Sequence, residues 1–329
     1  MPTRPCRRAR IAVRIWAPCL FSIAVLPAAA QPREINLRNA GEADPPIQVD
    51  VRLVVLHATV RDPHGALALG LDEKNFRVTE NGEPQIVRVL APEDTPAAIG
   101  LVVDNSGSMR GRRQEALAAA LTLARASNPA DDVFIVNFNE RPAFALGDTK
   151  LFSASIPEME RALLDSHPEG RTALYEAIAA ALAHVRRSGK EQRALVVISD
   201  GADNASRRNL RQILLEVAQA DVAIYASGLY GEDDSPAFRG ALHKLAQASG
   251  GEAFVPDSSA GILRACDHIA RAIRTQYTLA YSPTNPRLDG TYRAVKVTTS
   301  GHSGKRLTVR TRAGYVASPE GSNGAEARR

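Results

Sequence analysis

The sequence predicts an α/β fold, in which a doubly wound, mostly parallel sheet is inserted in a small antiparallel β-sandwich. Apolar strand patterns alternate with helix patterns over 97–275, which is typical of a parallel sheet covered by helices. Period-two β patterns occupy both flanks, at 47–96 and 276–316, and each flank alone is too short for a stable core. The chain has 329 residues, enough for one large domain and one smaller one.

The first thirty residues have the order of a secretory signal peptide. Five arginines precede an apolar run at 15–26, and three alanines end at Ala30. The run is too short to span a membrane, so we expect cleavage after Ala30, a secreted or periplasmic protein, and no transmembrane segment after cleavage. Residues 1–30 also hold five of the 41 basic residues and none of the 36 acidic ones. The remaining net charge is close to zero, so the composition gives no reason to expect a nucleic-acid partner.

A polar linker and the first half of the β-sandwich follow. Residues 31–46 are polar and contain two adjacent prolines, so we expect a linker there. The first sandwich half covers 47–96. Alternating apolar residues at 49–55 predict a strand that ends in a turn over 57–65. The stretch 75–89 predicts a hairpin around Asn81-Gly82, a pair that favours a two-residue β-turn.

The segment 97–275 carries the predicted α/β domain. Strands are expected at 98–104, 132–138, 194–199, 222–227 and 252–255, with a short one near 142–146. Helices are expected near 112–126, 156–165, 173–187, 207–220, 237–249 and 260–274. Several of the helical segments are rich in alanine and have the apolar spacing of helices that pack on a sheet.

The β pattern returns in the second half of the sandwich, 276–316. Because the ends of a compact domain commonly lie close together, we expect this half to pair with the first and to enclose the α/β domain as an insertion. Residues 317–329 are rich in small and polar residues and are expected to form a disordered tail.

Polar residues follow the predicted strands at places where a cation could bind. A buried apolar strand ends at Asp104, and Ser106 and Ser108 come directly after it. Thr172 stands just before a predicted helix, and Asp200 follows a second apolar strand. In parallel sheets, ligands bind at the carboxyl ends of the strands. All five side chains offer oxygen atoms, which favours Mg²⁺ or Mn²⁺ over Zn²⁺ or Cu²⁺.

On these residues, the segment 97–275 resembles the von Willebrand factor type A domain with its metal-ion-dependent adhesion site. The resemblance implies a Rossmann-like α/β domain and implies that the ion is held by Asp104, Ser106, Ser108, Thr172 and Asp200. The flanks that begin at Val49 and Gln276 further resemble proteins related to this family that are found mainly in acidobacteria. The resemblance therefore also implies a bacterial protein.

The resemblance implies a metal-dependent protein-binding module for adhesion or assembly, and no enzyme. Mg²⁺ takes six oxygen ligands and commonly keeps several waters. An acidic side chain from an unknown protein or peptide can replace one of these waters and complete the shell. Arg110, Arg112 and Arg113 follow the first loop. They either add attraction to an acidic partner or are ordinary solvated charges at a helix start.

Two alternatives remain open at this point. In a Mg²⁺-dependent phosphohydrolase of the haloacid-dehalogenase type, Asp104 would be the nucleophile, and Asp200 with Asp203 would hold the metal. Ser106 stands where that family usually has an acid/base aspartate, which weighs against this hypothesis. The other alternative is a purely structural domain, in which the serines and Thr172 only cap helices.

Overall fold

The computed structural model describes residues 53–91, 95–147, 149–230, 236–300 and 307–317. The predicted signal peptide (1–30), the linker (31–46) and the tail beyond residue 317 lie outside the described residues, as does the start of the first predicted strand (49–52). Within the described ranges, none of the helices has both the length and the apolar character needed to cross a membrane.

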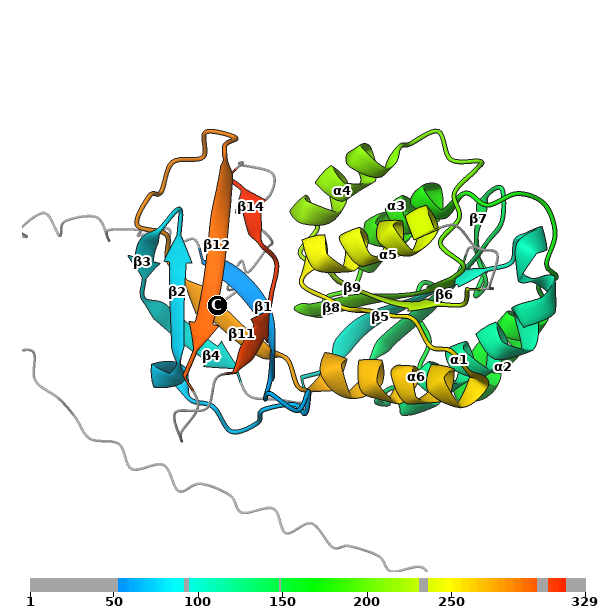
Figure 1. Cartoon of the computed structure of the whole chain (residues 1–329), viewed down its shortest axis with the longest axis horizontal. Coiled ribbons are helices and arrows are strands. Elements are labelled where there is room, and N and C mark those ends of the chain that lie inside the picture. Colours follow the sequence, from blue (N-terminus) through cyan, green and yellow to red (C-terminus); the bar gives the residue numbers. More distant parts are fainter. Residues whose placement is uncertain (1–52, 92–94, 148, 231–235, 301–306, 318–329) are drawn as a thin grey trace, which may run out of the picture. The chain divides into compact units, whose positions relative to one another are not determined.

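A six-stranded sheet forms the centre of the α/β domain (Figure 1). Its strands are β5 (Ala97–Asp104), β6 (Asp132–Phe138), β7 (Pro142–Phe144), β8 (Gln192–Ser199), β9 (Ala223–Gly228) and β10 (Ala253–Phe254). They lie in the order β10-β9-β8-β5-β6-β7, and every neighbouring pair is parallel except β6 and β7. The doubly wound, mostly parallel sheet predicted from the sequence is therefore confirmed.

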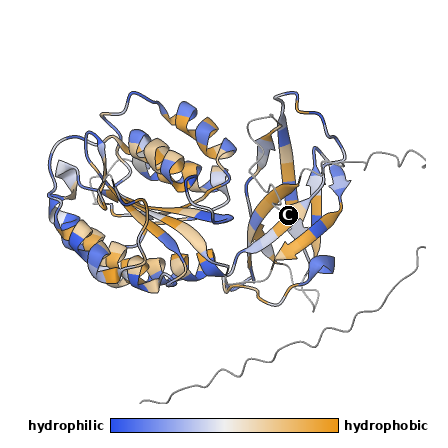
Figure 2. Cartoon of the chain, turned by 180° about the vertical axis from the view of Figure 1, so that it is seen from behind, coloured by the Kyte–Doolittle hydropathy of each residue, from blue (hydrophilic) through white to orange (hydrophobic). Residues whose placement is uncertain are grey.

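Helices cover both faces of this sheet (Figure 1). On one face lie α1 (Arg113–Ala126), α2 (Ile156–Leu164) and α6 (Ser259–Arg274), and on the other lie α3 (Leu174–Val185), α4 (Leu210–Gln219) and α5 (Pro236–Ser249). Leu101 belongs to the first of the two resulting cores and Val102 to the second. Successive strand residues point to opposite faces, so a sheet covered on both sides requires the uninterrupted apolar runs seen here. Figure 2 shows these apolar strands between helices that carry both hydrophobic and hydrophilic residues.

Gly100 lets large side chains of the two neighbouring strands meet over the middle of β5. A Cβ atom at this position would lie 2.4 Å from the Phe134 ring and 2.6 Å from Cδ2 of Leu195. Phe134 and Leu195 are both buried in the core beneath α3, α4 and α5. The absence of a side chain at residue 100 is therefore part of how this core is filled.

The segments on either side of the α/β domain together form two four-stranded antiparallel sheets. Their strands are β1 (Val54–Arg61), β2 (Phe76–Glu80), β3 (Glu83–Gln85), β4 (Val87–Ala91), β11 (Tyr277–Tyr281), β12 (Tyr292–Thr299), β13 (Thr308–Arg310) and β14 (Gly314–Val316). One sheet has the order β13-β1-β11-β4 and the other β14-β12-β2-β3. Each sheet combines strands from both flanks, so the α/β domain is inserted in the sandwich, as the sequence predicts.

The first sandwich strand differs from the prediction. β1 continues to Arg61, whereas the pattern predicts a turn from His57 onward. The polar residues His57, Thr59 and Arg61 alternate with apolar ones and are nevertheless buried. Arg61 forms an ion pair with Glu252 of the α/β domain at 2.6 Å. The polar residues that suggested a turn are therefore one face of a strand, the face that contacts the inserted domain.

The predicted hairpin over 75–89 forms only in part. Asn81 and Gly82 both have positive φ angles, as the two-residue turn between β2 and β3 requires. The second arm then divides, because β3 pairs with β2 while β4 pairs with β11 in the other sheet. The chain changes sheets at Ile86, whose side chain is exposed between the two short strands.

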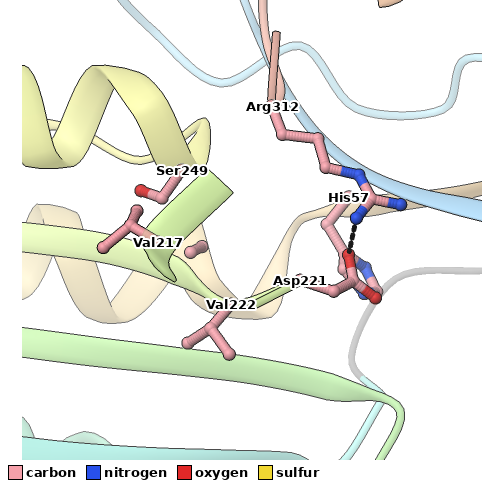
Figure 3. A pocket seen from close by; sticks show the side chains of 7 residues that line it. His57, Val217, Asp221, Val222, Ser249 and Arg312 are labelled. Carbon is pink, nitrogen blue, oxygen red and sulfur yellow. Dashed lines mark ion pairs between the residues drawn. The ribbon is translucent and has the colours of Figure 1, made fainter. Parts of the chain in front are cut away.

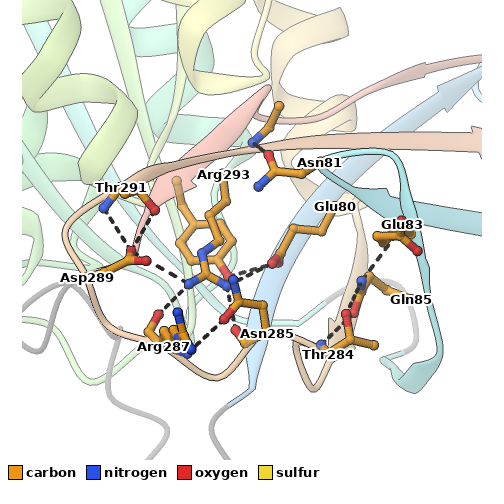
Figure 4. Close-up of polar contacts among 12 residues, drawn as sticks. Glu80, Asn81, Glu83, Gln85, Thr284, Asn285, Arg287, Asp289, Thr291 and Arg293 are labelled. Carbon is orange, nitrogen blue, oxygen red and sulfur yellow. Dashed lines mark hydrogen bonds and ion pairs between the residues drawn. The ribbon is translucent and has the colours of Figure 1, made fainter.

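A buried ion pair joins β2 and β12 of the sandwich (Figure 4). Arg293 and Glu80 are 1% and 3% exposed, with Nη1 and Oε1 3.2 Å apart. The hydroxyls of Tyr281 and Tyr315 donate to Oε2 of Glu80 at 2.7 and 2.9 Å. Arg293 also donates to two backbone carbonyls in the loop 282–291 (Figure 4). These bonds compensate both buried charges and fix the loop between β11 and β12.

A second charged contact joins the sandwich to the inserted domain. Arg312 and Asp221 form an ion pair at 3.2 Å beside a cavity of about the size of one water molecule, also lined by His57 and Val222 (Figure 3). Burial lowers the pKa of His57. Asp221 and Val222 precede β9, so the cavity lies at the amino-terminal edge of the parallel sheet. The predicted metal residues lie at the opposite edge.

Candidate metal centre

The five residues predicted to bind a metal lie on three connections at the carboxyl edge of the sheet. Asp104 is the last residue of β5, and Ser106 and Ser108 follow it where the 3-10 helix η2 (Gly107–Arg112) begins. Asp200 comes directly after β8, and Thr172 lies two residues before α3. Because β5 and β8 are parallel neighbours, Asp104 and Asp200 leave the sheet at the same edge.

Hydrogen bonds hold the three connections together. The N–H of Gly107, in the first loop, donates to the carbonyl of Gly170 in the second at 3.0 Å. A Cβ atom on Gly107 would lie 3.2 Å from that same oxygen, so glycine permits the close approach. Thr172 joins the second loop to the third, because its N–H donates to Oδ1 of Asn204 at 2.9 Å and its carbonyl accepts the N–H of Asn204 at 2.9 Å.

Asn105 braces the first loop between the predicted metal residues. Its Nδ2 donates to Oγ of Ser166 at 3.1 Å, and its Oδ1 accepts from Nη1 of Arg113 at 2.9 Å. Arg113 also donates to the carbonyl of Leu164 at 3.2 Å. Arg113 is therefore neither a solvated charge nor free to attract a partner, and it fixes the first loop against the end of α2.

Asp104 is buried, at 1% exposure, and two donors hold its carboxylate. Oδ1 accepts the N–H of Ser106 at 2.9 Å, and Oδ2 accepts the hydroxyl of Ser199 at 2.6 Å. Burial is the main reason why the pKa of Asp104 is raised to about 6; the negative charge of Asp200 also raises it, whereas the hydrogen bonds from Ser199 and Ser106 lower it. The ionised carboxylate is therefore unfavourable in this environment without a nearby cation.

The donor set fits a hard divalent cation. Asp200 is buried like Asp104, and within the described part of the chain neither carboxylate has an ion-pair partner. The hydroxyl oxygens of Ser106 and Ser108 are 3.0 Å apart, and Ser108 is exposed whereas Ser106 is buried. In the same described ranges, no group of three or more His, Cys, Asp or Glu could hold a metal. A cation at this edge would thus be held by two carboxylates and several hydroxyls, and reached from solvent on the side of Ser108.

Asp203, which the phosphohydrolase hypothesis assigns to the metal, is directed toward the start of α3. Its Oδ1 accepts the hydroxyl of Ser206 at 2.6 Å and the N–H of Tyr175 at 3.3 Å. Burial raises the pKa of Asp203. A carboxylate that accepts N–H groups of the first helical turn is acting as a helix cap.

Sequence reasoning does not identify Ser199 and Asn204, although both shape the site. Ser199 is a fully buried hydroxyl at the end of β8, and it donates to Asp104. The available signal is a polar residue that ends an apolar run directly before Asp200. Asn204 lies in a polar loop where no local pattern distinguishes it from its neighbours.

Comparison with known proteins gives one family and a set of solved structures. Residues 99–202 match the family model of the von Willebrand factor type A domain. A von Willebrand factor type A structure from Catenulispora acidiphila is 13% identical, with 85% of this chain and 78% of that chain covered and a TM-score of 0.49. The vWF domain of the type V pili tip protein Mfa5 from Porphyromonas gingivalis is 13% identical, with 55% and 95% covered and a TM-score of 0.47. Proximal thread matrix protein 1 from the mussel byssus, solved with a zinc-occupied MIDAS motif, is 17% identical, with 59% and 50% covered and a TM-score of 0.49. No curated protein matches the chain.

Proposed function

Since residues 99–202 match the family model of the von Willebrand factor type A domain, we propose that this protein is an exported, divalent-metal-dependent binding module and not an enzyme. The metal, Mg²⁺ or Mn²⁺, is held by Asp104, Ser106, Ser108, Thr172 and Asp200. An acidic side chain of a partner protein or peptide completes the coordination shell, in adhesion or in the assembly of a complex. The order of arginines, apolar run and alanines in residues 1–30 supports export.

The observation that carries this proposal is a pair of buried carboxylates, Asp104 and Asp200, that form no ion pair with a Lys, Arg or His side chain within the described residues. Asp104 and Asp200 are 1% and 2% exposed, and burial, with a smaller contribution from the negative charge of Asp200, raises the pKa of Asp104. A divalent ion reverses this effect, because its charge favours both ionised carboxylates. A structural domain without a ligand would gain nothing from burying two acids side by side.

The same donor set explains why the site suits a carboxylate ligand. The two aspartates balance the formal charge of a divalent ion but do not remove its attraction for anions. Hydroxyl oxygens such as that of Ser108 add no negative charge. The ion therefore remains attractive to a further anion. Because Ser108 is the exposed member of the set, the partner reaches the ion from that side.

The surroundings of Asp104 do not favour the phosphohydrolase hypothesis. Both carboxylate oxygens of Asp104 already accept hydrogen bonds, from Ser106 and Ser199, which reduces their nucleophilicity. The carboxylate of Asp203 accepts hydrogen bonds from Tyr175, at the start of α3, and from Ser206. It is therefore not arranged to share a metal with Asp200. A binding function needs neither a nucleophile nor a second acid.

Thermal unfolding of the purified protein in Mg²⁺, Mn²⁺ or EDTA tests the metal site. Circular dichroism is the suitable signal, because the one tryptophan, Trp16, lies in the predicted signal peptide. We expect the ions to raise the midpoint, by about 2.7 kcal/mol of stability at a hundredfold excess over the dissociation constant. D200N should abolish the response.

The matched control is D203N, which makes the same substitution in the same loop and should keep the response to Mg²⁺. If neither ion raises the wild-type midpoint, the site does not bind metal and the proposal fails. Hydrolysis of p-nitrophenyl phosphate that requires Mg²⁺ and disappears in both D200N and D203N would instead support the phosphohydrolase. We expect no such turnover.

A further inference from the structure

Two exposed arginines stand beside the candidate metal residues, and each is anchored to a loop of the site. Arg110 follows the first loop, and its Nε donates to the carbonyl of Pro168 in the second loop at 3.3 Å. Arg171 directly precedes Thr172, and its guanidinium donates to the carbonyl of Asn204 in the third loop. Both guanidinium groups are thus positioned at the site by bonds to backbone oxygen atoms.

Neither of these two arginines forms an ion pair within the described residues. Neither guanidinium lies within 4.0 Å of a carboxylate there, although Glu140 is near. Glu140 accepts the backbone N–H of Arg171 at 3.3 Å, while the guanidinium extends to the third loop. Arg208, farther along that loop, is by contrast paired with two glutamates. Arg110 and Arg171 therefore keep their charge and most of their N–H donors for a ligand.

From this arrangement we propose that Arg110 and Arg171 bind a second acidic side chain of the partner, next to the one that coordinates the metal. The partner is then a protein segment with two acidic residues close together in sequence. This inference rests on the proposed function, which supplies the first contact. Guanidinium groups bind carboxylates through paired N–H donors. Anchoring them in advance reduces the conformational entropy that is lost on binding.

The charges around the arginines favour a short acidic segment over a long polyanion. Asp165 and Glu169 are exposed on the second loop, and Glu140 is exposed on the turn between β6 and β7, so the surface alternates in sign and is not a uniform basic patch. A nucleic acid or sulfated polysaccharide would place negative charge against these acids. A peptide with two adjacent acidic side chains reaches the metal and the arginines and need extend no farther.

The test compares two immobilised peptides, one with a single glutamate among glycines and one with two adjacent glutamates. Binding of the purified protein is measured in Mg²⁺ and in EDTA for the wild type and for R110Q, R171Q and R187Q. Arg187 is exposed beyond the far end of α3, so R187Q makes the same change in charge away from the site. Circular dichroism establishes that each variant is folded.

We expect the wild type to bind the two-glutamate peptide about tenfold more tightly than the one-glutamate peptide in Mg²⁺. R110Q and R171Q should each reduce this ratio toward one, with binding of the one-glutamate peptide changed by less than about twofold. R187Q should keep the wild-type ratio. The arginine proposal is overturned if R110Q and R171Q keep the ratio, or if R187Q reduces it equally.

The proposed function and the arginine proposal fail separately in this experiment. One-glutamate binding that is equal in Mg²⁺ and EDTA refutes the metal-dependent function, whatever the arginine variants do. Heparin serves as a further probe. If heparin binds as tightly as the two-glutamate peptide, and R110Q and R171Q weaken it equally, the partner is a general polyanion and the assignment of an acidic peptide is wrong.

Discussion

Replacing Asp104 with Asn removes a buried negative charge at almost constant size, and we expect it to stabilise the metal-free protein. Burial, assisted by Asp200, raises the pKa of Asp104 from its ordinary 3.8 to about 6. At about 1.4 kcal/mol per pKa unit, the ionised carboxylate costs about 3 kcal/mol above pH 6. This cost already includes the hydrogen bonds from Ser199 and Ser106 to the ionised form, but the NH2 group of Asn cannot accept one of them, which takes back about 1 to 2 kcal/mol. The net expectation is a gain of about 1 to 2 kcal/mol in the free energy of unfolding.

The sign of the pH dependence follows from the direction of the shift in pKa. Between pH 3.8 and about 6, folded Asp104 holds a proton that the unfolded chain has released, so the free energy of unfolding falls as the pH rises through this window. Below pH 3.8 the carboxyl is protonated in both states and the penalty is absent. The advantage of D104N should therefore be full at pH 7.5 and absent at pH 4.

Urea unfolding in EDTA, followed by circular dichroism at pH 7.5 and pH 4, measures this difference. Adding Mg²⁺ at pH 7.5 should then raise the midpoint of the wild type and leave that of D104N unchanged, because the variant lacks a metal ligand. The reasoning is refuted if D104N is less stable than the wild type in EDTA at pH 7.5. It is also refuted if Mg²⁺ stabilises both proteins equally.

Two further predictions concern the cores of the sandwich and of the α/β domain. R293M leaves Glu80 buried without its cation and should lower the free energy of unfolding by about 3 to 5 kcal/mol in urea titrations, and adding E80L should restore much of the loss. A double variant no more stable than R293M would contradict this account of the ion pair. G100A places a Cβ atom 2.4 Å from the Phe134 ring and should cost about 1 to 3 kcal/mol, whereas G111A, with no atom within 4 Å of its Cβ, should cost clearly less. Equal losses in these two variants would show that the contact with Phe134 is not the cause.

Much of the fold could be predicted because a sheet covered on both faces leaves a strong pattern. The run 99–103 is apolar at every position, and the alanine-rich helix of 174–185 packs closely on the same sheet. The candidate ligands could be named for a related reason. Asp104 and Asp200 interrupt apolar strands abruptly, and the connectivity of a parallel sheet brings such strand ends to one edge.

The remaining features depend on contacts between residues that are distant in sequence. The polar residues His57 and Thr59 favour a turn in the sequence pattern. They are strand residues in the structure because the inserted domain covers that face of β1. The change of sheet at Ile86 follows from pairing of β4 with β11, which begins almost two hundred residues later. Ser199 is a strand residue by every local measure, and its role appears only when Asp104 is placed beside it.

The pairing of β4 with β11 makes the α/β domain equivalent to the loop of a single hairpin. Ala91, the last residue of β4, lies opposite Thr278 near the start of β11, so the insertion begins and ends at one point of the sandwich. Loop closure costs only about 0.6 kcal/mol for each doubling of loop length. A whole domain can therefore occupy this position with little penalty to its host. Replacing the domain with a short turn is therefore opposed less by chain closure than by lost contacts, because Arg61 and Arg312 of the sandwich would lose their ion-pair partners Glu252 and Asp221.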